Sequence, residues 1–204
     1  MIDTSKVKLY HIVHIDRLAS IIDRGGLFSD RIVRRDDLTG TNIGNSNIKN
    51  ARLDRKIEDK HSLTVGDCVP FYFAPRSVML YVIKATGGQE QVIHLEFEYQ
   101  TILEYLEISN KRKFYTCTNA RANYTEFHQD FGTLSRLNWN AINAKNWTGC
   151  KEEKQAEFLV ETMVPWQLVK VIGVQNSQVF DQVKKQLEVI PYKPEVKLKP
   201  DWYY

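Results

Sequence analysis

The residue with the clearest chemical potential in this sequence is Glu157, a carboxylate set in the otherwise apolar run Gln155–Val160. Side chains of a strand alternate between the two faces of a sheet, so Glu157 shares a face with Leu159, opposite Phe158. A carboxylate on a largely buried strand costs free energy unless a cleft, a partner or a substrate stabilises its charge. We therefore expect Glu157 to act in a cleft. The alternative is an edge strand with one face in water.

Other common catalytic sites have recognisable spacings, and this sequence lacks them. It contains no G-x-x-x-x-G-K-[ST] phosphate loop, no G-x-G-x-x-G motif, no H-E-x-x-H zinc motif and no G-x-S-x-G nucleophile motif. Among the five histidines, only His11 and His14 are close in sequence, and they would point to opposite sides or belong to different elements. We expect no metal site, and we expect Cys68 to be a core residue rather than a nucleophile.

The composition is that of one globular domain, residues 1–204, with 43% hydrophobic and 26% charged residues. The net charge of +3 is compatible with a nucleic acid partner without requiring one. The three cysteines form no C-x-x-C pair, which favours a reducing compartment. No apolar stretch has the length of a membrane span, so we expect a soluble cytoplasmic protein with no membrane partner.

Hydrophobic periodicity and turn residues predict strands interleaved with helices. Strands are expected at Lys8–Ile12, Val69–Phe73, Gln91–Phe97, Phe114–Thr116, Gln155–Glu161 and Leu168–Val174. Helices are expected at Arg17–Arg24 with Asp16 as cap, at Ile48–Asp59, from Pro75 onward, at Leu134–Ala144, and from the cap Asn176/Ser177 to Leu187. The polar segment 28–47 is expected to be an exposed functional loop. Because the spacing is not that of regular βαβ units, the predicted class is α+β.

Four blocks of this sequence together resemble the DarT family, bacterial toxins that ADP-ribosylate single-stranded DNA with NAD as co-substrate. The blocks are Tyr10–His14, Val69–Tyr81, Gly88–Glu96 and Lys154–Val160, and the resemblance extends to Asp201–Tyr204. It implies an ADP-ribosyltransferase fold, in which two packed β-sheets with flanking helices enclose an NAD cleft.

The resemblance also implies roles for individual residues. Glu157 matches the family's catalytic glutamate, whose charge would oppose the positive charge that develops on the ribose as the nicotinamide bond breaks. His11 matches the family's NAD-binding histidine. The other NAD-binding positions that the resemblance implies are Ile12, His14, Gly44, Asn47, Arg52, Tyr72 and Leu80, and the DNA-binding positions are Lys49, Arg55, Arg76, Met79, Trp147 and Lys154. Without the resemblance, His11 would be interpreted as a strand histidine and Tyr72 as a core residue.

Two positions depart from the family's pattern. The family commonly has Arg-Arg where this chain has Ala51-Arg52, and the first arginine is linked to activating the thymine base, whose N3 must lose a proton. Ala51, at the position of the family's catalytic arginine, therefore predicts an attenuated variant, either engineered or natural. The second departure is Asn119-Ala120, where relatives often carry a histidine.

The segment Trp139–Lys154 precedes Glu157 and combines tryptophans with lysines. In ADP-ribosyltransferases, the loop at this place presents the target to the NAD cleft. Bases can stack on aromatic rings while lysines contact phosphates. Helical spacing favours a core position for Trp139, so Trp147 is the expected surface contact.

The sequence thus predicts the toxin of a toxin–antitoxin pair that transfers ADP-ribose from NAD to thymine in single-stranded DNA. The implied partner is a macrodomain-containing antitoxin that removes the modification. Two alternatives remain: an ADP-ribosyltransferase acting on guanine, RNA or protein, and a non-catalytic module that binds single-stranded DNA or NAD.

Overall fold

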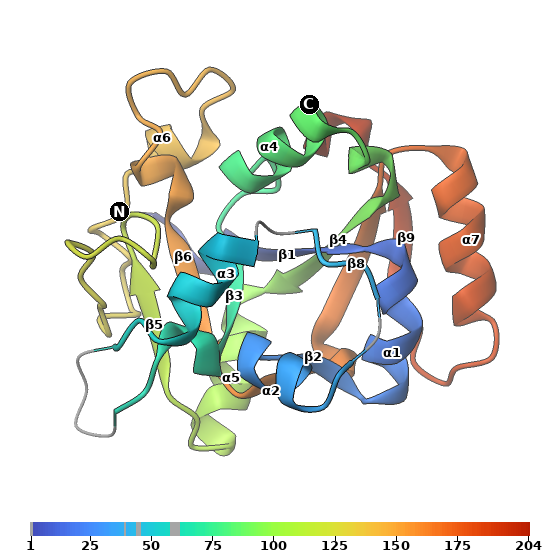
Figure 1. Ribbon diagram of the computed structural model, residues 1–204, viewed down its shortest axis with the longest axis horizontal. Helices are drawn as coiled ribbons and strands as arrows, with labels where there is room; N and C mark the ends of the chain where they lie inside the picture. Colours follow the sequence, from blue (N-terminus) through green and yellow to red (C-terminus); the bar gives the residue numbers. More distant parts are fainter. Residues whose placement is uncertain (1, 39, 44–45, 58–61) are drawn as a thin grey trace.

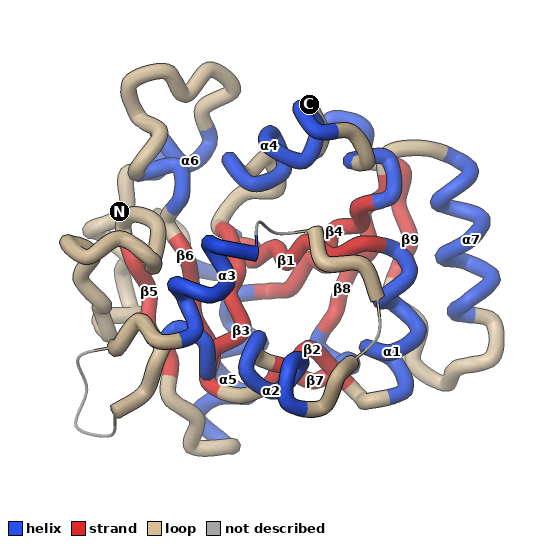
Figure 2. Tube along the Cα trace, viewed as in Figure 1, coloured by secondary structure: helices blue, strands red, loops and turns tan. Residues whose placement is uncertain are grey.

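The structure is a computed structural model that describes residues 2–38, 40–43, 46–57 and 62–204, without the side chains of residues 46–49 (Figure 1). A seven-stranded sheet has the order β5-β6-β3-β1-β4-β8-β9, and β2 and β7 form a second, two-stranded sheet (Figure 2). The strands of the large sheet are β1 (Lys8–His14), β3 (Cys68–Tyr72), β4 (Val92–Glu98), β5 (Lys113–Thr116), β6 (Glu157–Glu161), β8 (Val169–Val174) and β9 (Glu195–Leu198). The small sheet consists of β2 (Gly26–Phe28) and β7 (Met163–Pro165). The predicted α+β class, with two packed sheets and flanking helices, is confirmed.

Helices cover both faces of the large sheet. They are α1 (Leu18–Asp23), α2 (Asp30–Arg35), α3 (Ser46–Leu53), α4 (Val78–Thr86), α5 (Tyr99–Ile108), α6 (Trp139–Asn143) and α7 (Ser177–Leu187). Alternation along β1 shows why both faces need cover, because Leu9 belongs to the main core whereas Tyr10 and Ile12 belong to a second apolar cluster that also contains Leu80 of α4. None of the helices in the described residues is long and apolar enough to span a membrane.

The large sheet is nearly divided in two between β1 and β3. β1 pairs with β4 along its whole length, from Lys8↔Glu98 to His14↔Val92, but it meets β3 only at Tyr10↔Tyr72. Pro70 of β3 has no N–H to donate to a neighbouring strand, so the ladder cannot continue there. The sheet therefore consists of a half β5-β6-β3 and a half β1-β4-β8-β9.

Most of the predicted strands are confirmed, with ends shifted by a few residues. β6 begins at Glu157, because Gln155 belongs to the preceding 3-10 turn. The alternative that β6 is an edge strand is wrong, since β6 lies between β5 and β3 and both Glu157 and Leu159 are buried. The sequence pattern predicts neither α5 nor the short strands β2, β7 and β9.

The helix predictions need larger corrections, because tertiary contacts set where these helices end. The segment 28–47, predicted as a loop, contains α2. α3 ends before the predicted Asp59, because the chain then pairs with its own continuation, where the N–H of Ile57 donates to the carbonyl of Leu63 at 2.8 Å. The predicted helix Leu134–Ala144 shortens to α6, since the left-handed backbone of Leu134 (φ 47°) does not fit a right-handed helix.

Two predicted helix starts are also corrected. Asp16 does not cap α1, because its carboxylate accepts hydrogen bonds from the backbone N–H of Thr41 at 3.0 Å and from the Thr41 hydroxyl at 2.6 Å. Pro75 precedes α4, and the cap is Ser77, whose hydroxyl accepts from the N–H of Leu80 at 3.1 Å. Both aspartate and serine are common caps, so local sequence alone does not decide between such candidates.

Residues 202–204 are fixed against the centre of the sheet. The Trp202 ring lies over Gly173 of β8 so closely that a methyl group on residue 173 would overlap the ring. The Tyr203 hydroxyl donates toward the carbonyls of Val92 and Gly173, at 2.8 and 3.1 Å. Gly173 is therefore required for the close approach of this segment rather than for backbone freedom.

We predict that Gly173→Ala destabilises the protein by about 1–3 kcal/mol, because an added methyl overpacks the contact with Trp202. The matched control is Gly132→Ala, where an added Cβ meets no atom within 4 Å and the backbone is not left-handed. The control should change stability by no more than about 0.5 kcal/mol. Denaturant unfolding of both variants measures the difference, and equal stability of the two would contradict the packing argument.

Candidate functional site

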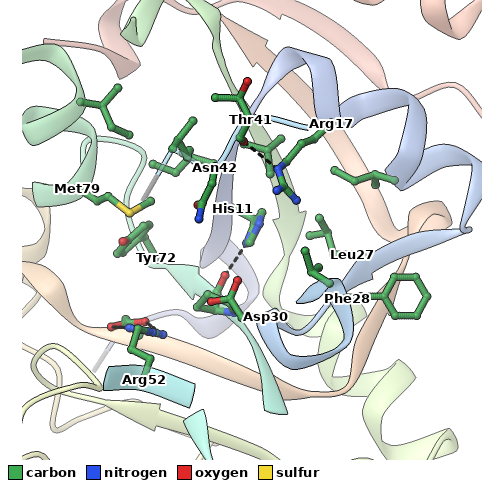
Figure 3. A pocket seen from close by; sticks show the side chains of 18 of the residues that line it. His11, Arg17, Leu27, Phe28, Asp30, Thr41, Asn42, Arg52, Tyr72 and Met79 are labelled. Carbon is green, nitrogen blue, oxygen red and sulfur yellow. Dashed lines mark hydrogen bonds and ion pairs between the residues drawn. The ribbon is translucent and has the colours of Figure 1, made fainter. Parts of the chain in front are cut away.

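A pocket of about 230 Å³ opens where the two halves of the large sheet separate. Its walls are mainly apolar and come from β1, β2, α2 and α4, with Ile12, Leu27, Val33, Met79 and Val82 as examples. Its polar lining includes His11, Arg17, Asp30, Asn42, Arg52 and Glu157. Most of these side chains point toward one another in Figure 3. An apolar concavity with a few converging polar groups is the usual form of a small-molecule site.

Glu157 is held at this pocket by the interior of the sheet. Its side chain is 2% exposed, and the strand registers place it beside Tyr72 of β3 and Thr116 of β5. Oε1 accepts a hydrogen bond from the backbone N–H of Ala120 at 3.0 Å, and the N–H of Glu157 donates to the Thr116 hydroxyl at 3.2 Å. The carboxylate is therefore fixed from its own strand, from a neighbouring strand and from the loop after β5.

Arg52 of α3 forms a buried ion pair with Glu157. Its Nη1 and Nη2 donate to Oε1 and Oε2 of the carboxylate at 2.9 and 2.7 Å. Burial disfavours the charged guanidinium, whose side chain is 11% exposed, but the attraction of Glu157 outweighs burial and raises the pKa of Arg52. A two-pronged pair of this kind fixes direction as well as charge, so Arg52 sets the orientation of the carboxylate.

Tyr72 adds a hydrogen-bond donor beside this pair. Burial, reinforced by the negative charge of Glu157, raises the pKa of the Tyr72 hydroxyl. The hydroxyl therefore stays protonated at neutral pH, next to the carboxylate. Tyr72 is also the residue of β3 that pairs with β1, so it lies where the two halves of the sheet meet.

His11 bridges that division from the other half of the sheet. Its Nδ1 lies 2.7 Å from the carbonyl oxygen of Pro70, and because a carbonyl can only accept, Nδ1 carries the proton. The ring also packs edge-on against Phe71, with the ring centroids 5.8 Å apart. In Figure 3, His11 lies in the middle of the labelled side chains. The His11 side chain, which lines the pocket, thus binds the Pro70 carbonyl in place of a backbone hydrogen bond between β1 and β3.

The segment that carries Thr41 and Asn42 closes another side of the pocket. Arg17 donates from Nε to the Thr41 carbonyl at 2.9 Å and from Nη2 to the Gly40 carbonyl at 3.0 Å. Together with the bonds of Asp16 to Thr41, these contacts attach the segment to the start of α1. The predicted functional loop 28–47 contains Asp30 and Asn42, but the sequence analysis names neither residue. Arg17, which also lines the pocket, lies outside that loop and is not predicted.

Two amides lie beside Glu157 in the pocket lining, Asn119 and Gln155. Asn119 donates from Nδ2 to Gln155 Oε1 at 3.2 Å and accepts from the N–H of Arg121 at 2.9 Å. Gln155 donates from Nε2 to the Lys151 carbonyl at 2.9 Å. The direction of the Asn119 amide is thus fixed by its neighbours.

The other predicted NAD-binding residues divide into three groups. Ile12 and Tyr72 line the pocket with His11 and Arg52. His14 and Leu80 are not among its lining residues. The His14 ring accepts from the N–H of Asp16 at 3.3 Å, and the Leu80 side chain, on the inner side of α4, is fully buried. Gly44 and the side chain of Asn47 lie outside the described residues.

The predicted DNA-binding residues also separate. Met79 lines the pocket, and the side chain of Lys49 lies outside the described residues. Arg55 is occupied with protein carbonyls, since its Nη2 donates to Asn123 and Thr125 at 3.3 Å. Lys154 is 5% exposed and donates to the carbonyl of Ile142 at 2.9 Å, so the structure does not present it to a phosphate. Arg76 precedes α4, and its guanidinium lies 4.4 Å from the ring centroid of Tyr204. Trp147 packs edge-on against Tyr81 of α4, with ring centroids 5.3 Å apart.

Ala51 lies on the exposed side of α3 and does not line the pocket. The adjacent Arg52 points inward to Glu157 instead. Neighbouring helical residues differ by about 100° in direction, so only one of these two positions can face the carboxylate. No group of three or more histidine, cysteine, aspartate or glutamate side chains that could hold a metal ion occurs in the described part of the chain.

Comparisons with known proteins agree with this geometry. Residues 10–204 match the family model described as "DarT: ssDNA thymidine ADP-ribosyltransferase, DarT". The chain is 34% identical to a DNA ADP-ribosyl transferase of Thermus aquaticus, over 96% of this chain and 88% of that protein. It also resembles the structure of Thermus sp. 2.9 DarT in complex with ADP-ribosylated ssDNA, with a TM-score of 0.88 and 32% identity over 97% of this chain and 96% of that chain.

A second structure, Thermus sp. 2.9 DarT in complex with NAD+, matches with a TM-score of 0.82 and 32% identity, over 97% of this chain and 98% of that chain. The family model and the relatives span nearly the whole sequence, and the structural matches span the whole fold. This chain therefore belongs to the DarT family of NAD-dependent DNA ADP-ribosyltransferases.

Proposed function

We propose that this protein transfers ADP-ribose from NAD+ to the N3 atom of thymine in single-stranded DNA and acts as the toxin of a toxin–antitoxin pair. The observation that carries the proposal is the buried Arg52–Glu157 pair at the pocket, in a chain whose relatives include a DarT bound to NAD+ and to ADP-ribosylated ssDNA. A carboxylate fixed at the edge of an apolar pocket suits a reaction in which positive charge develops on a sugar.

In the proposed reaction, the bond between nicotinamide and ribose C1′ breaks, and nicotinamide leaves with the bonding electrons. Positive charge then spreads over C1′ and the ring oxygen, where the carboxylate of Glu157 stabilises it more strongly than in the ground state. Thymine N3 gives its electron pair to C1′ and releases its proton to water. Arg52 keeps its own proton and orients Glu157, and its positive charge favours the deprotonated base.

The pocket lining supports NAD+ as the co-substrate. Apolar walls from Ile12, Leu27 and Val33 can cover the flat rings, while His11 and Arg17 offer polar contacts to ribose and diphosphate. The division of the sheet gives a long ligand access to both halves of the fold.

The antitoxin partner is proposed from a relative. A DNA ADP-ribosyl transferase–DNA ADP-ribosyl glycohydrolase fusion protein of Thermosipho africanus is 26% identical over 186 residues, and the match spans 88% of this chain but 45% of the fusion protein. A transferase joined to an activity that removes ADP-ribose fits a toxin kept harmless by its antitoxin. We propose a macrodomain-containing partner with that second activity for this chain.

We predict that Glu157→Gln lowers ADP-ribose transfer by about 10²–10³-fold, because the amide keeps the shape but lacks the charge that opposes the cationic sugar. The matched control is Glu161→Gln on the same strand. Glu161 also makes an arginine pair, with Arg112 Nη2 at 2.7 Å, but it does not line the pocket. The measurement is transfer to a thymine oligonucleotide, with NAD+ binding as the test of folding. Equal activity of the two variants would remove Glu157 from the chemistry.

A second prediction separates the two adjacent positions of α3. Arg52→Lys should lower transfer by at least about tenfold, since a lysine cannot form the two-pronged pair with Glu157. Ala51→Arg should leave transfer unchanged, because residue 51 faces solvent. The sequence instead predicts attenuation through Ala51, and this pair of variants decides between the two expectations. A gain of activity in Ala51→Arg would show that residue 51 is the catalytic position and that this chain is attenuated.

A third prediction concerns the acceptor. Thymine N3 is hydrogen-bonded inside a base pair, so transfer should require an unpaired thymine. The wild-type protein should add ADP-ribose, detected by mass, to a thymine-containing single strand, and not to the matching duplex or to a strand in which cytosine replaces thymine. Modification of a guanine-only strand, of RNA or of protein side chains would favour the alternative acceptors. NAD+ and DNA binding without any product would favour a non-catalytic module.

A further inference from the structure

Three threonine hydroxyls form a hydrogen-bonded chain at the end of β5 and in the loop that follows it. Thr116, the fully buried last residue of β5, donates from its hydroxyl to the carbonyl of Thr118 at 2.7 Å. The hydroxyls of Thr118 and Thr125 lie 2.7 Å apart, and Thr125 donates to the carbonyl of Asn119 at 2.8 Å. A hydroxyl has only one hydrogen to give, so Thr118 is the donor to Thr125. We call Thr116, Thr118 and Thr125 the threonine chain.

The threonine chain fixes the course of the loop 117–125. The N–H of Ala122 donates to the carbonyl of Asn119 at 3.0 Å, and the N–H of Thr125 donates to the carbonyl of Ala122 at 3.1 Å. The Asn119 carbonyl therefore accepts twice, from the Ala122 N–H and from the Thr125 hydroxyl. Because Thr125 is 6% exposed, water cannot easily replace its hydroxyl if that group is removed.

This loop supplies one of the donors that hold Glu157. The N–H of Ala120 donates to Glu157 Oε1 at 3.0 Å, and Ala120 directly follows the residue whose carbonyl Thr125 binds. At the other end of the threonine chain, the Thr116 hydroxyl accepts from the backbone N–H of Glu157 at 3.2 Å. The threonine chain thus connects the backbone of Glu157 with a donor to its carboxylate.

The same loop is attached to the segment that carries Arg52. Arg55 donates from Nη2 to the carbonyls of Asn123 and Thr125 at 3.3 Å. The N–H of Arg55 donates to the carbonyl of Arg52, also at 3.3 Å. Two partners of the Glu157 carboxylate, the Ala120 N–H and the Arg52 guanidinium, are therefore connected to one loop.

We propose that the threonine chain positions Glu157 for the proposed transfer, by holding the N–H of Ala120 against Oε1. Its three members are not among the residues that line the pocket, so they act on the reaction through Glu157 rather than by touching NAD+. A small displacement of a catalytic group can cost a large factor in rate, because the stabilisation of the developing charge depends on exact placement. The inference rests on the proposed function, since it names residues that support Glu157 in that reaction.

The main variant is Thr125→Val, which keeps the branched shape and removes the hydroxyl. In transfer to a thymine oligonucleotide, kcat should fall about tenfold, while KM and binding of NAD+ change by less than about twofold. Thr125→Ser keeps a hydroxyl and should retain kcat within about twofold of the wild type. Thr118→Val changes a half-buried position, so it should show a smaller loss of kcat in the same direction, and it tests the inference even if Thr125→Val folds poorly.

The matched control is Thr4→Val. The Thr4 hydroxyl accepts from Gln100 Nε2 at 3.0 Å, and neither residue lines the pocket. This variant also loses a side-chain hydrogen bond of a threonine, so it should lower stability slightly and leave kcat unchanged.

A positioning role is separated from a structural one by repeating Thr125→Val in the Glu157→Gln background, with single-turnover transfer as the measurement. The loss of about tenfold should shrink to less than about twofold there, because the charge that the threonine chain positions is absent. Equal losses in both backgrounds would overturn the inference, as would equal kcat for Thr125→Val and Thr4→Val. Either result leaves the proposed function standing as long as the wild type modifies DNA. If the wild type modifies no thymine strand, the proposed function fails and this inference fails with it.

Discussion

The candidate site depends on one constraint, the loss of strand pairing between β1 and β3. Only Tyr10 and Tyr72 pair there, and Pro70 cannot donate the next hydrogen bond. The carbonyl of Pro70 is bound instead by the ring of His11, at 2.7 Å. The pocket lies beside this break in the ladder, lined by residues from both halves of the sheet. The residues that compensate for the break are also residues that line the pocket.

The second requirement is the buried ion pair between Arg52 and Glu157 at the pocket. Removing one partner of a buried ion pair is strongly destabilising, by about 3–5 kcal/mol, although the intact pair adds little to stability by itself. The pair of Arg52 and Glu157 is therefore better understood as a device that holds a carboxylate in one orientation away from bulk water. The backbone N–H of Ala120 adds a further donor to the same oxygen that Arg52 Nη1 binds. The orientation of the Glu157 carboxylate thus depends on α3, β6 and the loop after β5 together.

Helix α4 connects this chemistry with the surface. Its Leu80 is fully buried in the apolar cluster, its Met79 and Val82 line the pocket, and its Tyr81 faces solvent. Successive helical residues are rotated by about 100°, so one short helix presents three different environments within a single turn.

The sequence by itself determined the elements whose signals are local. Alternating apolar residues predicted β1, β3, β4 and β8, and the cap Asn176 predicted the start of α7, where its side chain accepts from the N–H of Val179 at 2.9 Å. Glu157 could be singled out because an isolated carboxylate in an apolar strand needs a physical reason. Only the tertiary structure decided that Arg52 rather than residue 51 faces it, because packing sets how a helix is rotated about its axis. It also decided the burial of Lys154 and the division of the sheet, since both arise from contacts between residues far apart in the chain.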